Sequence, residues 1–126
     1  VDGRMEIVMR EKAVLINMNQ KDVQEIYRCC SRMGIGVIVA DNSQDQLLLE
    51  KLAECPFYKG GTVSEASGKS VVLMCDFTEK HFDKLLDYIK HSDVHVDFKA
   101  VLTPTNMKWD SRKLIAHMEF ESLQKR

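Results

Sequence analysis

The chain alternates short apolar runs with stretches in which apolar residues recur at helical spacing. Continuous apolar runs bounded by turn or capping residues predict β-strands at residues 13–16, 37–40, 71–75 and 100–102. A strand with one face in water would alternate apolar and polar residues, whereas continuous runs indicate strands covered on both faces. We therefore expect helices, or a partner subunit, on each side of the sheet.

Amphipathic helices are predicted after the first and third runs. Their apolar stripes are Val23, Ile26, Tyr27 and Cys30 in one helix and Phe82, Leu85, Leu86 and Ile89 in the other. Asn19 and Thr78 stand at the N-cap positions, where side-chain oxygens accept hydrogen bonds from free backbone N–H groups. Both helices should therefore begin directly after these residues.

Two further helices are expected. Residues 44–53 are rich in leucine and predict a short helix with Asn42 or Ser43 as its cap. A last helix should begin after Trp109, whose ring can pack against Leu114.

An internal match indicates a duplicated unit. The two helical stripes coincide when the chain is shifted by 59 residues, and the strands before them, residues 12–15 and 69–72, coincide at a shift of 57. The expected fold class is α/β, an α+β sandwich in which two β-α-β units form a ferredoxin-like four-stranded sheet with extra helices. A doubly wound parallel sheet is the alternative.

The domain organisation follows from these elements. We expect residues 1–11 to be an N-terminal arm or a remnant of expression, and residues 12–126 to be a single domain. That domain divides into the first β-α-β unit with the short helix (12–55), a flexible linker (56–69), and the second unit with the last helix (70–126). Residues 60–68 are small and polar, which is typical of either a mobile connection or a lid.

Composition and charge exclude several classes of protein. With 44% hydrophobic and 29% charged residues, the composition is that of a globular domain. The net charge of −1, with both signs interspersed, provides no strong field for nucleic acid or acidic membranes. No apolar run is long enough to span a bilayer, and the first residues do not resemble a signal peptide. We expect a cytoplasmic protein with no nucleic-acid or membrane partner.

The four cysteines do not form a recognisable framework. Cys29 and Cys30 are adjacent on a predicted helix, Cys55 precedes a proline, and Cys75 ends a predicted strand. A C-x-x-C pair or a Cys/His cluster at ligand spacing is missing from the sequence. We therefore predict reduced, mostly buried thiols, and neither a metal nor a cofactor.

A polar corner at residues 103–109 is the candidate ligand site. A strand-like run ends at Pro104, and Thr103, Thr105 and Asn106 surround it before the only tryptophan, Trp109. Hydroxyl, amide and backbone donors between a strand end and a helix start are placed where α/β folds bind anions. The same residue types also specify a stable turn without any ligand. Both interpretations are open at this point.

Other polar residues are weaker candidates. If the chain is extended there, Asp93, His95 and Asp97 point to one side, which could hold a divalent metal but is more typical of a solvated strand edge. His81 and His117 have no evident partner for acid–base chemistry. Nucleophile elbows, phosphate-binding glycine loops and metalloprotease helices are not found in the sequence. We therefore predict no catalytic residue.

The C-terminal half resembles a known bacterial family. Residues 99–106, Lys-Ala-Val-Leu-Thr-Pro-Thr-Asn, with Trp109 and Leu114 and with residues 73–86, are similar to domain of unknown function 3783. The resemblance covers about residues 70–124 and implies boundaries and a fold, but no activity. The sequence departs from the family at Asp76, where glycine is usual, and at Asp110, where threonine is usual. Asp76 would hinder any ligand that requires close backbone approach.

We expect a small non-enzymatic regulatory or binding module that forms a homodimer, because the apolar strands outnumber the helices available to cover them. An unidentified protein or small ligand would be its other partner. The alternative is a small-molecule sensor or an enzyme that uses the corner at residues 103–109, with residues 60–68 as a lid. An enzyme would need Cys75, Asp76 or His81 to face that corner with a perturbed pKa.

Overall fold

The computed structural model describes residues 11–124, so residues 1–10 of the expected arm lie outside the described part. A single sheet contains β1 (Lys12–Ile16), β2 (Gly36–Val39), β3 (Val71–Cys75) and β4 (Phe98–Val101) in the order β2-β1-β3-β4. β1 pairs with β2 and β3 pairs with β4 in parallel, whereas the central pair, β1 and β3, is antiparallel. The sheet is therefore mixed.

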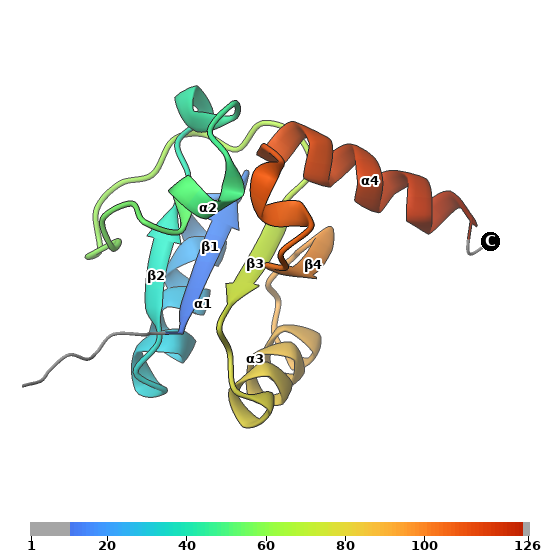
Figure 1. Ribbon diagram of the computed structural model, residues 1–126. Coiled ribbons are helices and arrows are strands. Elements are labelled where there is room, and N and C mark those ends of the chain that lie inside the picture. The colour runs from blue at the N-terminus through green and yellow to red at the C-terminus, as the bar shows by residue number, and fades with distance from the viewer. Residues whose placement is uncertain (1–10, 125–126) are drawn as a thin grey trace, which may run out of the picture.

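Helices cover both faces of this sheet (Figure 1). α1 (Gln20–Arg32) and α3 (Glu79–His91) pack on one face, and α2 (Leu49–Leu52) and α4 (Ser111–Gln124) pack on the other. In β1, Ala13 and Leu15 belong to the first core cluster, while Val14 and Ile16 belong to the second. The strands are thus apolar throughout because both of their faces are buried, and the mixed α/β class is confirmed. None of the helices within residues 11–124 is long and apolar enough to cross a membrane.

The two predicted β-α-β units are present. β1 and β3 have five residues each, α1 and α3 have thirteen each, and both pairs are related by a shift of 59 positions. The shift also relates Asn17 (φ 58°) to Asp76 (φ 59°), which both adopt the left-handed conformation after their strands. The shift of 57 predicted for the strands is therefore wrong. A change of two positions leaves every side chain on the same strand face, so the apolar pattern could not distinguish the two shifts.

The strand order corrects the ferredoxin-like detail of the prediction. In a ferredoxin-like sheet each β-α-β unit is split by a strand of the other unit. Here the two strands of each unit are neighbours, and the antiparallel contact between β1 and β3 joins two intact units. That antiparallel contact also excludes the doubly wound parallel alternative.

The predicted caps of the long helices are confirmed. Asn19 Oδ1 accepts a hydrogen bond from the backbone N–H of Asp22 (2.8 Å), and Thr78 Oγ1 accepts one from that of His81 (3.2 Å). Each cap satisfies a donor that the first helical turn leaves free.

The single helix predicted at residues 44–53 is wrong. The segment instead contains a short 3₁₀ helix, η2 (Asn42–Gln44), and then α2, because Leu48 between them is extended and forms a bridge with Asp110. Asp41, rather than Asn42 or Ser43, caps η2: its side chain accepts a hydrogen bond from the N–H of Ser43 (3.0 Å). Pairing with the distant corner thus interrupts a segment whose local pattern was helical.

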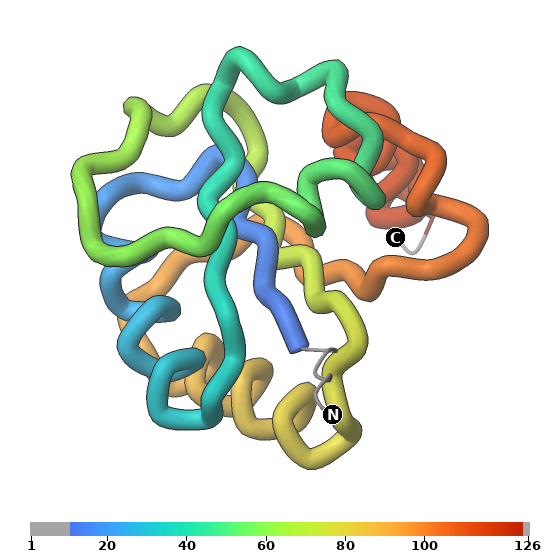
Figure 2. Tube along the Cα trace, turned by 60° about the vertical axis from the view of Figure 1, so that its left-hand side comes forward, coloured from blue at the N-terminus to red at the C-terminus, as the bar shows by residue number. Residues whose placement is uncertain are grey.

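Residues 56–69 contain no helix or strand and run past the ends of β1 and β2 (Figure 2). The N–H of Tyr58 donates to the carbonyl of Val37 at the edge of β2 (2.6 Å). Farther along, the side chain of Gln20 accepts a hydrogen bond from the N–H of Val63 (2.8 Å) and donates to the carbonyl of Gly61 (3.2 Å). The linker is therefore held against the first β-α-β unit.

Candidate functional site

Asn106 organises the predicted corner. Its side chain is buried, with the residue 8% exposed. Oδ1 accepts a hydrogen bond from the N–H of Thr103 (2.8 Å), Nδ2 donates to the carbonyl of Val101 (3.0 Å), and the backbone N–H donates to Thr103 Oγ1 (3.1 Å). These bonds use the polar groups that an anion would otherwise contact, so Asn106 and Thr103 act within the turn.

The carboxamide of Asn106 also extends the sheet. On the inner side, the N–H groups of Phe98 and Leu102 donate to the carbonyls of Ser70 and Met74, so the backbone groups of the intervening Val101 point toward the outer edge. The carboxamide bonds with the Val101 carbonyl and the Thr103 N–H as a peptide group of a neighbouring strand would. It therefore closes one end of the β4 edge.

Trp109 joins the corner to the helices of the same sheet face. It follows η3 (Asn106–Lys108), and its carbonyl accepts a hydrogen bond from the N–H of Leu49 (2.8 Å). The ring lies 5.0 Å, between centroids, from the imidazole of His117, and Lys113 Nζ lies 5.3 Å from the ring centroid. The tryptophan thus packs against the second core cluster, which contains Leu114, in agreement with the predicted contact between Trp109 and Leu114.

A groove of about 450 Å³ lies between the outer edge of β4 and α4. Trp109, Leu114 and Met118 form its apolar part, and Thr103 and Thr105 stand at its polar margin. Asn106 lines the groove as well, so four of the five predicted site residues meet there, whereas Pro104 does not. The volume lies within the range of small-molecule sites.

The three residues that the sequence offered for catalysis, Cys75, Asp76 and His81, do not line this groove, whereas His117 and Glu121 do. Cys75 is buried, and burial raises the pKa of its thiol to about 12, so the thiol is protonated at neutral pH. Asp76 is exposed at the end of β3, and His81 Nδ1 lies 2.8 Å from the carboxylate of Glu11.

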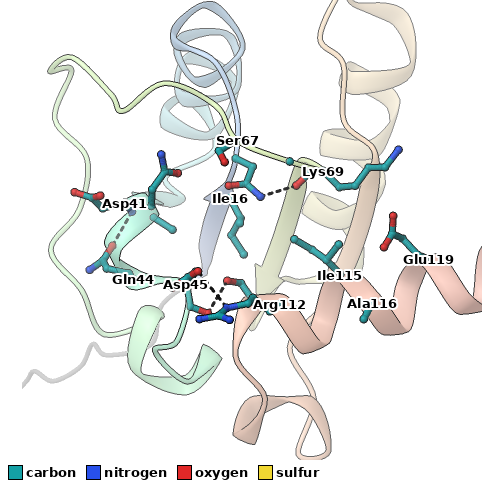
Figure 3. Close-up of a pocket in the computed structure, with 15 residues that line it drawn as sticks. Ile16, Asp41, Gln44, Asp45, Ser67, Lys69, Arg112, Ile115, Ala116 and Glu119 are labelled. Atoms are coloured by element: carbon teal, nitrogen blue, oxygen red, sulfur yellow. Dashed lines mark hydrogen bonds and ion pairs between the residues drawn. The ribbon is translucent and has the colours of Figure 1, made fainter.

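A second cavity, of about 400 Å³, lies at the carboxyl ends of the parallel strands β1 and β2 (Figure 3). Ile16 and Ile115 supply apolar surface, and the Arg112 Nε to Asp45 Oδ2 ion pair (3.1 Å) closes one side. Ser111 Oγ donates to the carbonyl of Asp45 (3.2 Å). Sequence reasoning missed this cavity because its walls come from four separate segments; the one available signal was that α/β folds bind ligands at carboxyl strand ends.

Comparison with known proteins assigns the second half of the chain. Residues 70–123 match the family described as Domain of unknown function (DUF3783). The DUF3783 segment contains β3, α3, β4 and α4, and hence the complete corner and groove. The resemblance predicted from the sequence is confirmed for these residues. No curated protein and no solved structure matches the chain.

Asp93, His95 and Asp97, in the middle of the DUF3783 segment, lie in a loop and not in a strand. His95 Nε2 lies 2.9 Å from Asp97 Oδ1, and Asp97 Oδ2 accepts hydrogen bonds from the N–H (2.8 Å) and hydroxyl (3.2 Å) of Ser70. The backbone N–H of Ser70, followed by the imidazole of His95, holds the pKa of Asp97 below its ordinary value. Asp93 is exposed, and within the described residues no three His, Cys, Asp or Glu side chains gather to hold a metal.

All four cysteines are free thiols, one of which, Cys75, lies in the DUF3783 segment. Three of them are buried, and Cys55 is partly exposed. Burial raises the pKa of Cys30 to about 12. The predicted mostly buried state of the thiols is therefore confirmed.

Proposed function

We propose that the protein is a small non-enzymatic binding module that associates with itself through α4. The observation that supports this proposal is an apolar stripe of Ala116, Phe120 and Leu123, spaced so that the three side chains share one face of the helix. Phe120 and Leu123 are 59% and 64% exposed. Figure 1 shows the C-terminal part of α4 extending beyond the sheet.

α4 carries a second apolar face that packs within the chain. Leu114 is buried, and Ile115 and Met118 pack against the same core cluster. A helix with apolar side chains on two opposite faces is expected to have a partner on each face. The sheet is one partner, and the stripe of Ala116, Phe120 and Leu123 needs another.

The charges of α4 favour a second copy of the same helix as that partner. Arg112 and Lys113 lie in the first half of α4, and Glu119 and Glu121 lie in the second half. Asp110 compensates the helix dipole at the N-terminus, since its side chain accepts a hydrogen bond from the N–H of Lys113 (2.9 Å), so the separation of charge lies within α4. If two copies of α4 pack antiparallel, the basic half of each faces the acidic half of the other.

The sheet edges favour a helical contact over strand pairing. At β4, the Asn106 carboxamide already donates a hydrogen bond to the Val101 carbonyl, which is then not available to another strand. If two β4 edges paired across a two-fold axis, the exposed Lys99 would face the Lys99 of the other copy. At β2, Tyr58 covers part of the edge through the carbonyl of Val37. Because helices of the same chain cover both sheet faces, the earlier reason for expecting a dimer no longer holds, and α4 replaces it.

A regulatory role in the cytoplasm is part of the same proposal. The free cysteines support this location, since reducing compartments keep thiols unpaired. A pair of identical modules would present two grooves and two cavities to other molecules.

Sedimentation equilibrium over a wide concentration range tests the proposal. We expect the wild type to form a dimer and Phe120→Glu to be a monomer with an unchanged circular dichroism spectrum. Ser122→Glu is the matched control, because it adds the same charge to an exposed position about 200° around the helix. A wild type that is monomeric throughout, or a dimer unaffected by Phe120→Glu, would refute the proposal.

As a second candidate, we propose a small-molecule sensor that uses the groove at residues 103–109. The apolar wall of Trp109, Leu114 and Met118 favours it, with Thr103 and Thr105 as the polar contacts. Native mass spectrometry of freshly purified protein would reveal a retained ligand, and Trp109 fluorescence would report its displacement. A bare protein whose fluorescence no small molecule changes would speak against the sensor.

A further inference from the structure

Asp22 is the buried polar residue with the poorest hydrogen bonding. Four polar residues are buried within residues 11–124, and the side chains of Ser70, Asn106 and Ser111 each form a hydrogen bond of 3.2 Å or less. Asp22 is 6% exposed, and its carboxylate accepts one long hydrogen bond, from the N–H of His95 to Oδ2 (3.4 Å). No described residue bonds to its other oxygen. A buried carboxylate in this state needs compensation from elsewhere.

The second β-α-β unit has a different ionisable residue at the position equivalent to Asp22. The shift of 59 positions relates Asp22 in the first turn of α1 to His81 in the first turn of α3. His81 of the second unit is partnered by Glu11, which directly precedes β1 of the first unit and places its carboxylate 2.8 Å from His81 Nδ1. The residue equivalent to Glu11 is Ser70, which directly precedes β3 of the second unit, and its hydroxyl bonds to Asp97 instead of Asp22. The ionisable residue on the helix therefore has a charged partner in one unit and none in the other.

A cavity of about 160 Å³ lies where that partner would be. Asp22, Ser70, His95 and Asp97 line it; the imidazole of His95 lies 2.9 Å from Asp97 Oδ1, and no described lysine or arginine lines the cavity. Asn17 also lines it; its Nδ2 donates to the carbonyl of Lys69 (2.9 Å), which leaves Oδ1 free to accept a hydrogen bond. The dipole of α1 offsets part of the Asp22 charge, but it supplies no hydrogen bond to the second carboxylate oxygen.

We propose that this cavity binds the primary ammonium group of a small amine. The ammonium would donate hydrogen bonds to the Asp22 carboxylate and to Asn17 Oδ1, and it would supply the charged partner that Asp22 lacks, since the imidazole of His95 is engaged by Asp97. An ammonium has three N–H donors and needs only a few acceptors. Calcium takes six to eight oxygen ligands, and both Asp97 oxygens are already engaged by His95 and Ser70. The chemistry of the cavity therefore favours an ammonium over a divalent metal.

Binding would also act on the linker. Ala66 and Gly68, from the segment between residues 60 and 68, line the same cavity. A ligand held by Asp22 and Asn17 would contact this segment and fix its position against the first β-α-β unit. The amine would then control whether residues 60–68 behave as a lid.

Thermal unfolding with methylammonium chloride as the probe tests the site, in a buffer without primary amines and at constant ionic strength. We expect methylammonium to raise the Tm of the wild type in a saturable way. Tetramethylammonium, which has no N–H donor, sodium and calcium should not. Asp22→Asn should abolish the response and raise the Tm without ligand, because the neutral amide removes a buried charge. Glu79→Gln, which removes an exposed acid from the first turn of α3, should keep the response.

Three outcomes would overturn the proposal: no saturable shift in the wild type, a shift retained by Asp22→Asn, or a shift with calcium or sodium but not with methylammonium. If Asp22→Asn does not fold, amide NMR spectra of the wild type decide. Methylammonium must then move the resonances of Asp22 and His95 and leave that of Glu79 in place. Unchanged Asp22 and His95 resonances would equally overturn the proposal.

Discussion

Replacement of Asn106 by alanine tests whether the corner is held by its carboxamide. The substitution removes two side-chain hydrogen bonds at the β4 edge, from the Thr103 N–H to Oδ1 (2.8 Å) and from Nδ2 to the Val101 carbonyl (3.0 Å). The bond from the backbone of residue 106 to Thr103 Oγ1 is retained, so the turn loses only the contacts that tie it to the sheet.

The expected loss in the free energy of unfolding is about 2 kcal/mol, at about 1 kcal/mol for each net hydrogen bond. Val101 and Thr103 are both exposed, so water can reach their freed groups and keep the loss near this value. For a domain of this size, the Tm should fall by about 8 °C, taking about 4 °C per kcal/mol.

Urea unfolding followed by the fluorescence of the single tryptophan measures the change. Thr105→Ala is the matched control, because Thr105 is exposed in the same turn and its side chain forms no capping hydrogen bond. We expect the control to cost less than about 0.5 kcal/mol. An Asn106→Ala loss as small as the control's would refute the structural role. Lost ligand binding with stability intact would instead restore Asn106 as a ligand contact.

Three further predictions follow from other contacts. Cys55 should be the only thiol that reacts quickly with Ellman's reagent in the native protein, and unfolding should expose all four. Although burial alone raises the pKa of Glu11, the Thr78 N–H and the imidazole of His81 hold it below the ordinary glutamate value of 4.5. Its stabilising effect is therefore full above about pH 4.5 and is lost as the pH falls through the lowered pKa, so urea titrations of wild type and Glu11→Gln should differ at neutral pH and converge in acid. In Gly36→Ala the new Cβ would lie 2.7 Å from Phe57 Cζ, so thermal unfolding should show a loss that Phe57→Ala relieves.

Local structure was predictable because its signals are contiguous. α1 and α3 begin after Asn19 and Thr78, since a cap and an apolar stripe lie within a few residues of each other. Strand order is different, because it depends on contacts between distant residues. The leucine-rich segment shows this: its local pattern predicts one helix, but the pairing of Leu48 with Asp110 interrupts it.

The same distinction separates the sites. Residues 103–109 could be predicted because the corner is one continuous segment, although the sequence could not show that the Asn106 carboxamide is used within it. Both cavities near the carboxyl end of β1 are assembled from separate segments. Asp22 in particular resembles an ordinary acidic residue of a first helical turn, and the His95 N–H that contacts its carboxylate comes from a distant loop.

The duplicated fold separates what the β-α-β unit requires from what is particular to each half. The left-handed residue after the strand, the helix cap and the helix length occur in both units, so they serve folding. The cavity at Asp22 and the stripe on α4 occur once, and they lie with helices on opposite faces of the sheet. Two sites separated in this way should not share partners and should act independently. Phe120→Glu should therefore leave the response to methylammonium intact, and Asp22→Asn should leave the dimer intact. Loss of both properties in either variant would mean that the substitution had disrupted the fold, and would count against both assignments.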